Sequence, residues 1–292
     1  MISIVIPAHN EERVIGRCLR GVTERADPGE LEIIVVCNGC SDRTADVARA
    51  FSGDVKVLET EVASKSHALN LGDSAALGFP RFYIDADVAV SLPAVRKVAE
   101  VLRGGRILAA APRMRVALEG VAWAVRAYYR IWMRLPYHAG GMIGSGFYAL
   151  SEEGRRRFTS FPNVISDDGF VRLHFAPHER VTVEGCCFQI TAPRSLWGVI
   201  KVKTRSQFGA YQLRRAFSEL LVNDPRRYGG VLAGLLARPW LWPSLAVYCL
   251  VLYVARARTL WRFLTSRHSV WDRDESSRAS GEGRRTIESS VR

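Results

Sequence analysis

The sequence has few cysteines, no internal repeat, and no low-complexity stretch apart from a tail rich in Ser and Arg. Six cysteines in 292 residues are too few for a small disulfide scaffold, and 48% hydrophobic residues exclude a disordered chain. The first residues contain no basic leader and no long apolar run, so we expect no signal peptide and free thiols. Cys37 and Cys40 have C-x-x-C spacing, but no second pair or nearby His follows, which favours a strand end entering a turn over a zinc or redox site.

Acidic residues are scarce only in the second half of the chain. Residues 1–120 hold 15 basic and 16 acidic side chains, whereas residues 121–255 hold 17 and 8, and residues 256–292 hold 9 and 5. This nearly neutral front and basic rear indicate that the rear meets an anionic surface or a phosphate-bearing ligand.

Short apolar runs alternate with helical patterns through the first 111 residues. The pattern predicts strands over residues 2–6, 31–36, 55–58, 82–84 and 107–111, and helices over residues 11–23, 42–51, 65–77 and 93–102. Strands without polar alternation, separated by such helices, predict an α/β fold with a parallel sheet covered on both faces.

Polar clusters follow three of these strands, at residues 9–12, 38–42 and 85–87. In sheets of this kind, ligands bind at the carboxyl ends of the strands. The three loops are therefore predicted to converge on one crevice.

Asp85 and Asp87 come directly after an apolar strand. Two carboxylates separated by one residue share a side of an extended chain, so both can face one divalent cation. Hard oxygen ligands suit Mg²⁺ or Mn²⁺, with water and diphosphate oxygens at the remaining positions. The alternative is a solvated turn.

Taken in order, six motifs resemble those of a family 2 glycosyltransferase with the GT-A fold. They are VIPAHNEE at 5–12, NGCSDRT at 38–44, KSHALNLG at 65–72, DAD at 85–87, GSG at 144–146 and SDD at 166–168. The resemblance extends to about residue 215. It implies a Rossmann-like, mostly parallel sheet flanked by helices, and transfer of a sugar from a nucleotide-diphosphate donor to a hydroxyl, with inversion at the anomeric carbon.

The resemblance also implies roles for the acidic residues. A cation held by Asp85 and Asp87 would stabilise the leaving diphosphate, and Asp168 aligns with the general base of the family, with Asp167 as its orienting or structural partner. The alternative for the pair is a helix N-cap.

By the same resemblance, the first two loops and the start of the third helix hold the donor. Asn38 stands where many relatives have Asp, which leaves the nucleotide base open, and Asp42 either caps a helix or reaches the nucleotide. Lys65 pairs with phosphate or is a solvated cation. The remaining expected donor-binding residues are Pro7, Ala8, Asn10 and Glu11, with Glu11 accepting from a hydroxyl.

Two further elements are expected near the diphosphate or the acceptor. Gly144, Ser145 and Gly146 form a loop that allows close approach of a ligand, or else a tight packing turn. Arg205 lies where many relatives carry a diphosphate-clasping Gln-Arg-x-x-Arg-Trp-like element, or else belongs to a basic membrane-facing helix. Because the full element and its Trp are missing, single-sugar transfer is favoured over processive polymerisation.

Residues 239–255 carry no charge, include four aromatic belt residues, and are followed by arginines. This length is at the lower limit for crossing a bilayer. A single crossing from the cytosol would export the Arg-rich tail, against the positive-inside tendency, so a helix lying in the interface is favoured over a spanning helix or a buried core helix. We expect association with the cytoplasmic face of a membrane and a lipid-linked or cell-envelope glycan acceptor.

The predicted organisation has three parts. Residues 1–222 form the catalytic domain, with a nucleotide-binding half (1–111) and an acceptor half (112–222), followed by a membrane-associated helical segment (223–267) and a polar, flexible tail (268–292). The alternatives are a sugar-nucleotide nucleotidyltransferase and a non-catalytic membrane-bound scaffold. A nucleic-acid partner is not expected, because the basic residues surround an apolar, Trp-rich segment and not a polar groove with stacking aromatics.

Overall fold

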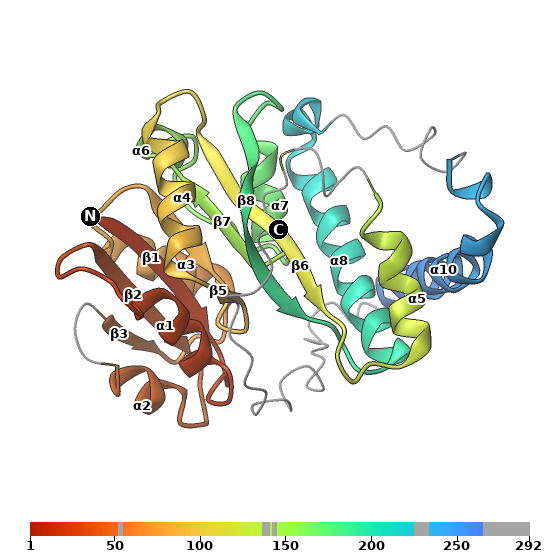
Figure 1. Ribbon diagram of the computed structural model, residues 1–292, viewed down its shortest axis with the longest axis horizontal. Helices are drawn as coiled ribbons and strands as arrows, with labels where there is room; N and C mark the ends of the chain where they lie inside the picture. The colour runs from red at the N-terminus through yellow and green to blue at the C-terminus, as the bar shows by residue number, and fades with distance from the viewer. Residues whose placement is uncertain (52–54, 136–140, 142–144, 225–233, 265–292) are drawn as a thin grey trace.

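The structure is a computed structural model that describes residues 1–51, 55–135, 141, 145–224 and 234–264. Its first part alternates strands and helices along the chain (Figure 1). The strands are β1 (Ile2–Ala8), β2 (Leu31–Asn38), β3 (Val55–Thr60) and β4 (Arg81–Ile84), and the helices between them are α1 (Ile15–Thr23), α2 (Thr44–Arg49) and α3 (Lys65–Ala75).

The second part adds four strands and longer helices. The strands are β5 (Ala89–Val90), β6 (Ala109–Ala117), β7 (Phe147–Leu150) and β8 (Arg180–Thr191). The helices are α4 (Leu92–Arg103), α5 (Trp123–Trp132), α6 (Glu152–Arg155), α7 (Asp167–Leu173), α8 (Leu196–Ala216) and α10 (Trp242–Leu264), with 3-10 helices η2 (Ser218–Asn223) and η3 (Pro239–Leu241).

Within the described residues, the strands form one eight-stranded sheet in the order β3-β2-β1-β4-β7-β6-β8-β5. The strands β1 to β4 are mutually parallel, as expected, but β7 runs antiparallel between β4 and β6, and β5 runs antiparallel to β8. The sheet is therefore mixed. A four-residue apolar strand such as β7 reads the same in either direction, so the pattern alone could not reveal its orientation.

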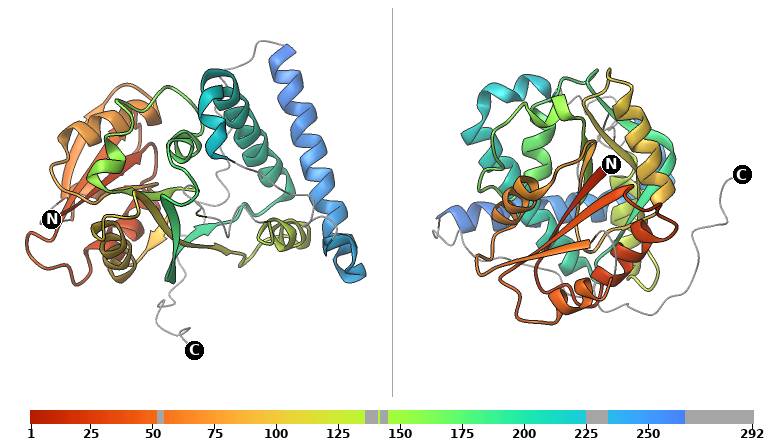
Figure 2. Two further views of the ribbon diagram at one scale, coloured as in Figure 1. Left: turned by 90° about the horizontal axis from the view of Figure 1, so that it is seen from above. Right: turned by 90° about the vertical axis from the view of Figure 1, so that its left-hand side faces the viewer.

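Both faces of the sheet are covered, which explains why the strands lack polar alternation. On one face, Ile4 and Ile33 pack with Ile15 of α1 and Val98 of α4; the other face packs against α3, α7 and α8. Figure 2 shows these helices as two layers on either side of the sheet.

Several element boundaries differ from the predicted ones for local reasons. Residues 11–14 form a turn, with the N–H of Val14 donating to the carbonyl of Glu11, so α1 begins only at Ile15. The helix α8 ends at Ala216, because Phe217 leaves the helical conformation (φ −137°, ψ 46°), and the ring of Phe217 contacts that of Phe170.

The rear helices α5, α8 and α10 pack together beyond β6, at the end of the molecule opposite β3 (Figure 1). Tyr128 of α5 stacks on Tyr248 of α10, with ring centroids 5.4 Å apart. The stretch Pro239–Arg262 is the one helix within the described residues that is long and apolar enough to cross a membrane, and 22% of its most apolar window is buried.

Candidate active site

The loops after β1 and β2 are tied together by hydrogen bonds. The backbone N–H of Ser41 donates to Asn10 Oδ1 at 2.8 Å, and that of Glu11 donates to Thr44 Oγ1 at 2.7 Å. Asn10 adopts a left-handed φ of 53°, a conformation that Asn tolerates better than most residues. Because β1 and β2 also pair in register as far as Ala8, the two loops form one surface at the end of the sheet.

Asp42 uses both carboxylate oxygens inside this surface. Oδ1 accepts from the backbone N–H of Thr44 at 3.0 Å, and Oδ2 accepts from that of Glu12 at 3.2 Å. Asp42 precedes Arg43, the N-cap of α2, and its carboxylate accepts from the first N–H of that helix. A contact between Asp42 and a nucleotide stays a prediction.

The other expected donor-binding residues of β1 and β2 lie at the strand ends. Pro7 and Ala8 are the last residues of β1 and are buried, and Asn38, the last residue of β2, is also buried. The carbonyl oxygen of Asn38 is hydrogen-bonded to the ring of His9. These residues are therefore buried at the base of the loops, whereas Asn10 is exposed on the loop surface.

The two thiols of the second loop lie at the same place. The N–H of Asn10 donates to Cys40 Sγ at 3.4 Å, and the Cys40 thiol donates to the carbonyl of Ala8 at 3.5 Å. A hydrogen bond from Cys37, aided by the Asn10 amide and opposed by burial, lowers the pKa of Cys40 to about 6. Both cysteines are free.

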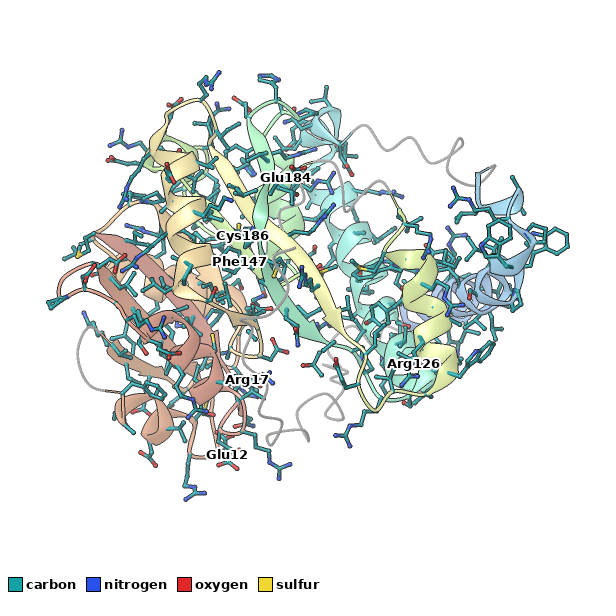
Figure 3. The ribbon with its side chains drawn as sticks, viewed as in Figure 1. Glu12, Arg17, Arg126, Phe147, Glu184 and Cys186 are labelled. Carbon is teal, nitrogen blue, oxygen red and sulfur yellow. The ribbon has the colours of Figure 1, made fainter. Side chains whose placement is uncertain are left out.

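Asp85 and Asp87 follow β4, next to β1 in the sheet, so they lie beside these loops. The backbone N–H of Asp85 donates to the carbonyl of Gly146 at 2.8 Å. Gly146 has a φ of 90°, and a Cβ there would lie 3.1 Å from Asp85 Oδ2, so only glycine allows this approach without strain. The carbonyl of Asp87 accepts from Arg17, which Figure 3 labels, at 3.3 Å.

Lys65, the first residue of α3, joins two acidic motifs that are far apart in the sequence. Its Nζ lies 2.6 Å from Asp85 Oδ1 and 3.0 Å from Asp167 Oδ1. Burial alone would lower the pKa of Lys65, but Asp167 and Asp85 outweigh it and hold that pKa above its usual value. Lys65 is therefore a charged, half-buried bridge and not the solvated cation considered above.

Asp167 is the more deeply buried of the adjacent acids. It begins α7 and is 4% exposed, and its Oδ2 accepts from the Tyr148 hydroxyl at 3.3 Å. Burial raises the pKa of Asp167 to about 6, with Asp168 and Asp85 adding to the effect and Lys65 opposing it. The carboxylates of Asp85, Asp167 and Asp168 share the one ammonium group of Lys65. Their mutual repulsion contributes to the raised pKa of Asp167.

Asp168 is half-buried and held by three donors. Its Oδ1 accepts from Ser166 Oγ and from the N–H of Gly169, both at 2.7 Å, and its Oδ2 accepts from the N–H of Ser145 at 2.9 Å. Ser145 lies in the glycine-dense loop and Asp168 in α7, so this contact joins the fifth and sixth sequence motifs. Gly144 lies outside the described residues.

The helix α8 supports the turn that carries the two acids. The backbone N–H of Ile165 donates to Gln212 Oε1 at 3.0 Å, and a Cβ on Gly209 would lie 3.0 Å from the side chain of Ser166. Arg205 lies one turn earlier on the same helix and is half-buried. Its contact with a diphosphate stays a prediction.

The residues present fit a divalent cation of the Mg²⁺ or Mn²⁺ kind. Asp85 and Asp87 offer carboxylate oxygens at the open end of the sheet, and the side chain of Asp85 is 35% exposed. Among the described residues, no group of three or more His, Cys, Asp or Glu side chains could hold a metal. One or two protein carboxylates, completed by substrate phosphates and water, is the usual arrangement for Mg²⁺.

Two contributors to this site were not foreseen from the sequence. Tyr148 lies outside all six motifs, and Ser166 is part of the SDD motif but has no predicted role of its own. The signal available for Tyr148 was its hydroxyl on an otherwise apolar strand two residues after Gly146, because buried tyrosine hydroxyls usually find a partner.

Residues 3–150 match the family model of glycosyl transferase family 2, which is half of the chain. The chain belongs to glycosyl transferase family 2. Over 94 residues it is 39% identical to the probable glycosyltransferase YdaM of Bacillus subtilis, a match that covers 30% of this chain and 22% of YdaM. The chain therefore aligns with less than a third of the length of this curated relative.

Solved structures of two sugar-transferring enzymes share the fold. A mannosyltransferase of Pyrobaculum calidifontis, in complex with GDP-Man and Mn²⁺, matches with a TM-score of 0.64 and 18% identity, covering 89% of this chain and 87% of that one. Glucosyl-3-phosphoglycerate synthase of Mycobacterium tuberculosis, with Mn²⁺, UDP-glucose and phosphoglyceric acid, matches with a TM-score of 0.51 and 21% identity, covering 74% and 79%. The GT-A fold expected from the sequence is confirmed.

Proposed function

We propose that this family 2 member transfers a sugar from a nucleotide-diphosphate donor to an acceptor hydroxyl, with inversion, and that Asp168 is the general base. One observation carries the proposal: Lys65 lies within 3.0 Å of carboxylates from both acidic motifs. The metal motif after β4 and the acids at the start of α7 thus face one point at the end of the sheet, beside the loops of β1 and β2. A donor diphosphate bound there can be shared by all four elements.

Asp168 is suited to take the proton of the acceptor. An alcohol is a poor nucleophile near neutral pH, and a carboxylate that removes its proton during attack typically contributes about 10²- to 10⁴-fold. The three hydrogen bonds to Asp168 fix its orientation, and its partial exposure lets an acceptor reach it. Asp167 is buried against Lys65 and Tyr148, so it positions the lysine and does not reach the acceptor.

The leaving nucleoside diphosphate gains negative charge as the glycosidic bond breaks. A divalent cation bound by Asp85 and Asp87 supplies positive charge to those phosphate oxygens. Lys65 supplies a second positive charge at the same place, and its raised pKa keeps it protonated throughout the physiological range. Charge that is already in position costs no reorganisation at the moment of reaction.

The nucleotide is proposed to lie on the joined loops of β1 and β2, near Asn10, Glu11 and Asn38. Asn38 is uncharged, and its amide can accept from a pyrimidine ring N–H or donate to a carbonyl. The relatives with bound donors carry GDP-Man in one case and UDP-glucose in the other. The identity of the base is therefore a question for titration.

The rear of the molecule supports association with a membrane. The helix that includes residues 239–262 is apolar, mostly unburied, and exposes Trp240, Trp242, Tyr253 and Trp261. Large aromatic side chains of this kind are enriched at membrane interfaces. We infer that the protein binds the cytoplasmic face of a membrane, on the side where nucleotide-sugars are made, and acts on a lipid-linked or cell-envelope glycan.

Flotation with phosphatidylglycerol vesicles tests the association with a membrane. Trp240→Ser/Trp242→Ser should reduce the fraction of protein bound to the vesicles. Equal binding by the parent protein and this variant would contradict the inference.

Donor binding tests the activity itself. The full chain is titrated with UDP-, GDP- and dTDP-sugars with and without Mn²⁺, and both thermal stability and donor hydrolysis are followed. Stabilisation by one nucleotide, dependent on Mn²⁺ and weakened by Asp87→Ala, is the expected result. No response to any donor would overturn the proposal in favour of a non-catalytic scaffold.

A further inference from the structure

A second feature with strong charge lies away from the acidic cluster. A cavity of about 730 Å³ lies between β6 and α5, and five arginines line it. They are Arg113 and Arg115 of β6, together with Arg126, Arg130 and Arg134 of α5 and the residues that follow it; Figure 3 labels Arg126. We call it the arginine cavity.

The arginines of this cavity lack the acidic partners that other arginines have. Arg96, for example, binds Glu30 with two hydrogen bonds, and Arg157 pairs with Glu179. In the described part of the chain, none of the five cavity arginines forms an ion pair, although Arg134 donates to the carbonyl of Arg130. Guanidinium groups that gather without counterions repel one another, so the cavity is suited to a multiply charged anion.

Guanidinium groups bind phosphate oxygens through charge-assisted hydrogen bonds. Two arginines that alternate on a strand and three that recur along a helix can approach a phosphate or diphosphate from two sides. An isolated carboxylate has fewer oxygens to satisfy so many donors. The chemistry of the cavity therefore favours a phosphate-bearing ligand.

The remaining walls of the cavity are apolar, with Met114, Val116 and Leu118 on the β6 side and Met133 and Leu135 on the other. A free phosphate gains no binding energy from apolar walls. An amphiphile can bury the first carbons of its hydrocarbon chain against them. The same helix, α5, packs through Tyr128 on α10, the apolar helix proposed to meet the membrane. A lipid in that membrane would thus lie near α5, which forms one wall of the cavity.

The sheet register places the cavity near the metal motif. Arg115 of β6 lies opposite Gln189 of β8, and Gln189 lies opposite Ala89 of β5. Ala89 follows Asp87 by only two residues. Neighbouring strands are about 4.8 Å apart, so Arg115 and Ala89 lie on the order of 10 Å apart along the sheet. One or two sugar units span that distance.

We propose that the arginine cavity binds the phosphate or diphosphate of a lipid-linked acceptor, with its proximal hydrocarbon against the apolar walls and its sugar hydroxyl directed to Asp168. This inference rests on the proposed transferase function and names the acceptor class. The glycan is presented at the end of the sheet while its lipid stays in the membrane.

Binding of farnesyl diphosphate to the full chain in mild detergent with EDTA tests the proposal. Arg113→Gln/Arg130→Gln should weaken binding about tenfold or more, because each lost contact is a charge-assisted hydrogen bond. Arg113→Lys/Arg130→Lys should retain most of the affinity. The control Arg20→Gln/Arg103→Gln, which changes exposed arginines on α1 and α4, should bind like the parent protein.

Comparison ligands identify what is recognised. Farnesol tests the need for phosphate, and inorganic diphosphate tests the need for the lipid; both should bind at least tenfold more weakly than farnesyl diphosphate. Equal binding of either ligand, unaltered affinity in the Gln pair, or an equal loss in the control pair would overturn the proposal.

Donor stabilisation with Mn²⁺ is measured on the same proteins, so that the two proposals fail separately. If no donor stabilises the parent protein, the transferase proposal fails, while the farnesyl diphosphate series still decides whether the cavity binds lipid phosphate. If Arg113→Gln/Arg130→Gln does not fold, Arg113→Lys/Arg130→Lys becomes the deciding variant. Loss of affinity in that folded variant would contradict recognition by charge.

Discussion

Two clusters of opposite charges lie at opposite ends of the helix α3, and they differ in their charge balance. At one end, Asp73 accepts from Arg81, Arg155 and Tyr83, so one buried carboxylate has two cations and a hydroxyl. At the other end, Lys65 alone is shared by Asp85 and Asp167. We call these the Asp73 cluster and the Lys65 cluster.

We interpret this difference in charge balance as the difference between a structural site, the Asp73 cluster, and a functional site, the Lys65 cluster. Burial alone would raise the pKa of Asp73, but its donors outweigh that effect and hold the pKa below its usual value. In the Lys65 cluster the sign is reversed, and the pKa of Asp167 is raised to about 6. In a cluster with surplus negative charge the carboxylates repel one another. Binding of a cation or of a cationic complex reduces that repulsion. We therefore expect the Lys65 cluster, and not the Asp73 cluster, to bind a ligand.

Asp168→Asn should produce the largest change, and only in activity. Removing the general base should lower the rate of transfer by about 10²- to 10⁴-fold, while Asn can still accept the N–H of Ser145. Stability should be unaltered or higher, because one of the mutually repelling charges is lost. Transfer kinetics and Mn²⁺-dependent donor binding are measured together. Unchanged transfer, or loss of donor binding instead, would refute Asp168 as the base.

Asp73→Ala should have the opposite effect, on stability alone. It leaves Arg81 and Arg155 buried without their carboxylate, which typically costs about 3–5 kcal/mol. Urea denaturation measures the loss. Glu152→Ala removes an exposed partner of Arg156 and should cost less than about 1 kcal/mol. Similar losses in both variants would show that the Asp73 cluster is not a structural centre.

The pH dependence of stability should have opposite signs for the two clusters. The folded pKa of Asp73 lies below the usual Asp value of 3.8, so its stabilisation is present above that pH and is lost as pH falls through the folded pKa. The folded pKa of Asp167 lies above 3.8, at about 6, so its stabilisation is present at low pH and is lost as pH rises through about 4 to 6.

Urea denaturation of the metal-free protein across this range checks both signs. Asp167→Asn should remove a loss of about 1–3 kcal/mol between pH 4 and pH 6, and Asp73→Asn should flatten the loss below about pH 4. If Asp167→Asn leaves the stability profile between pH 4 and pH 6 unchanged, the surplus negative charge of the Lys65 cluster does not raise the folded pKa of Asp167.

Much of the Lys65 cluster could be predicted, and almost nothing of the Asp73 cluster. Asp85 follows an apolar strand, so strand order predicts it at the ligand-binding end of the sheet, whereas Asp168 was predicted from the resemblance to family 2 glycosyltransferases. Asp73 lies in a helix and its partner Arg155 is 82 residues away, and neither residue belongs to a motif. Burial of such a pair depends on packing between distant elements, which no short window of sequence contains.

The same limit applies within the site. The sequence placed Lys65 near the donor but could not assign its bridge to Asp167, because the direction of a long side chain depends on which charges surround it after folding. The basic rear was visible as composition, whereas the cavity depends on β6 continuing to Ala117, beyond the residues 107–111 predicted for that strand. Pairing with β8, which includes a bulge between Pro112 and Arg113, produces that extension.

Gly146→Ala should give the smallest change, and it tests how closely backbone geometry supports the Lys65 cluster. A Cβ at Gly146 would lie 2.9 Å from Val88 Cγ2 and 3.1 Å from Asp85 Oδ2, at a φ of 90°. We expect a loss of about 1–3 kcal/mol in stability, together with weaker Mn²⁺-dependent donor binding as Asp85 is displaced.

Gly29→Ala is the matched control, because Gly29 has a φ of 73° but its Cβ would meet nothing within 4 Å. Both variants carry the strain of a left-handed alanine, and only Gly146→Ala crowds a carboxylate. Thermal stability and donor titration with Mn²⁺ separate the two effects. Weaker donor binding in Gly146→Ala alone supports a carboxylate held in place by the glycine loop. Equal donor binding in both variants would show that the position of Asp85 does not depend on that loop.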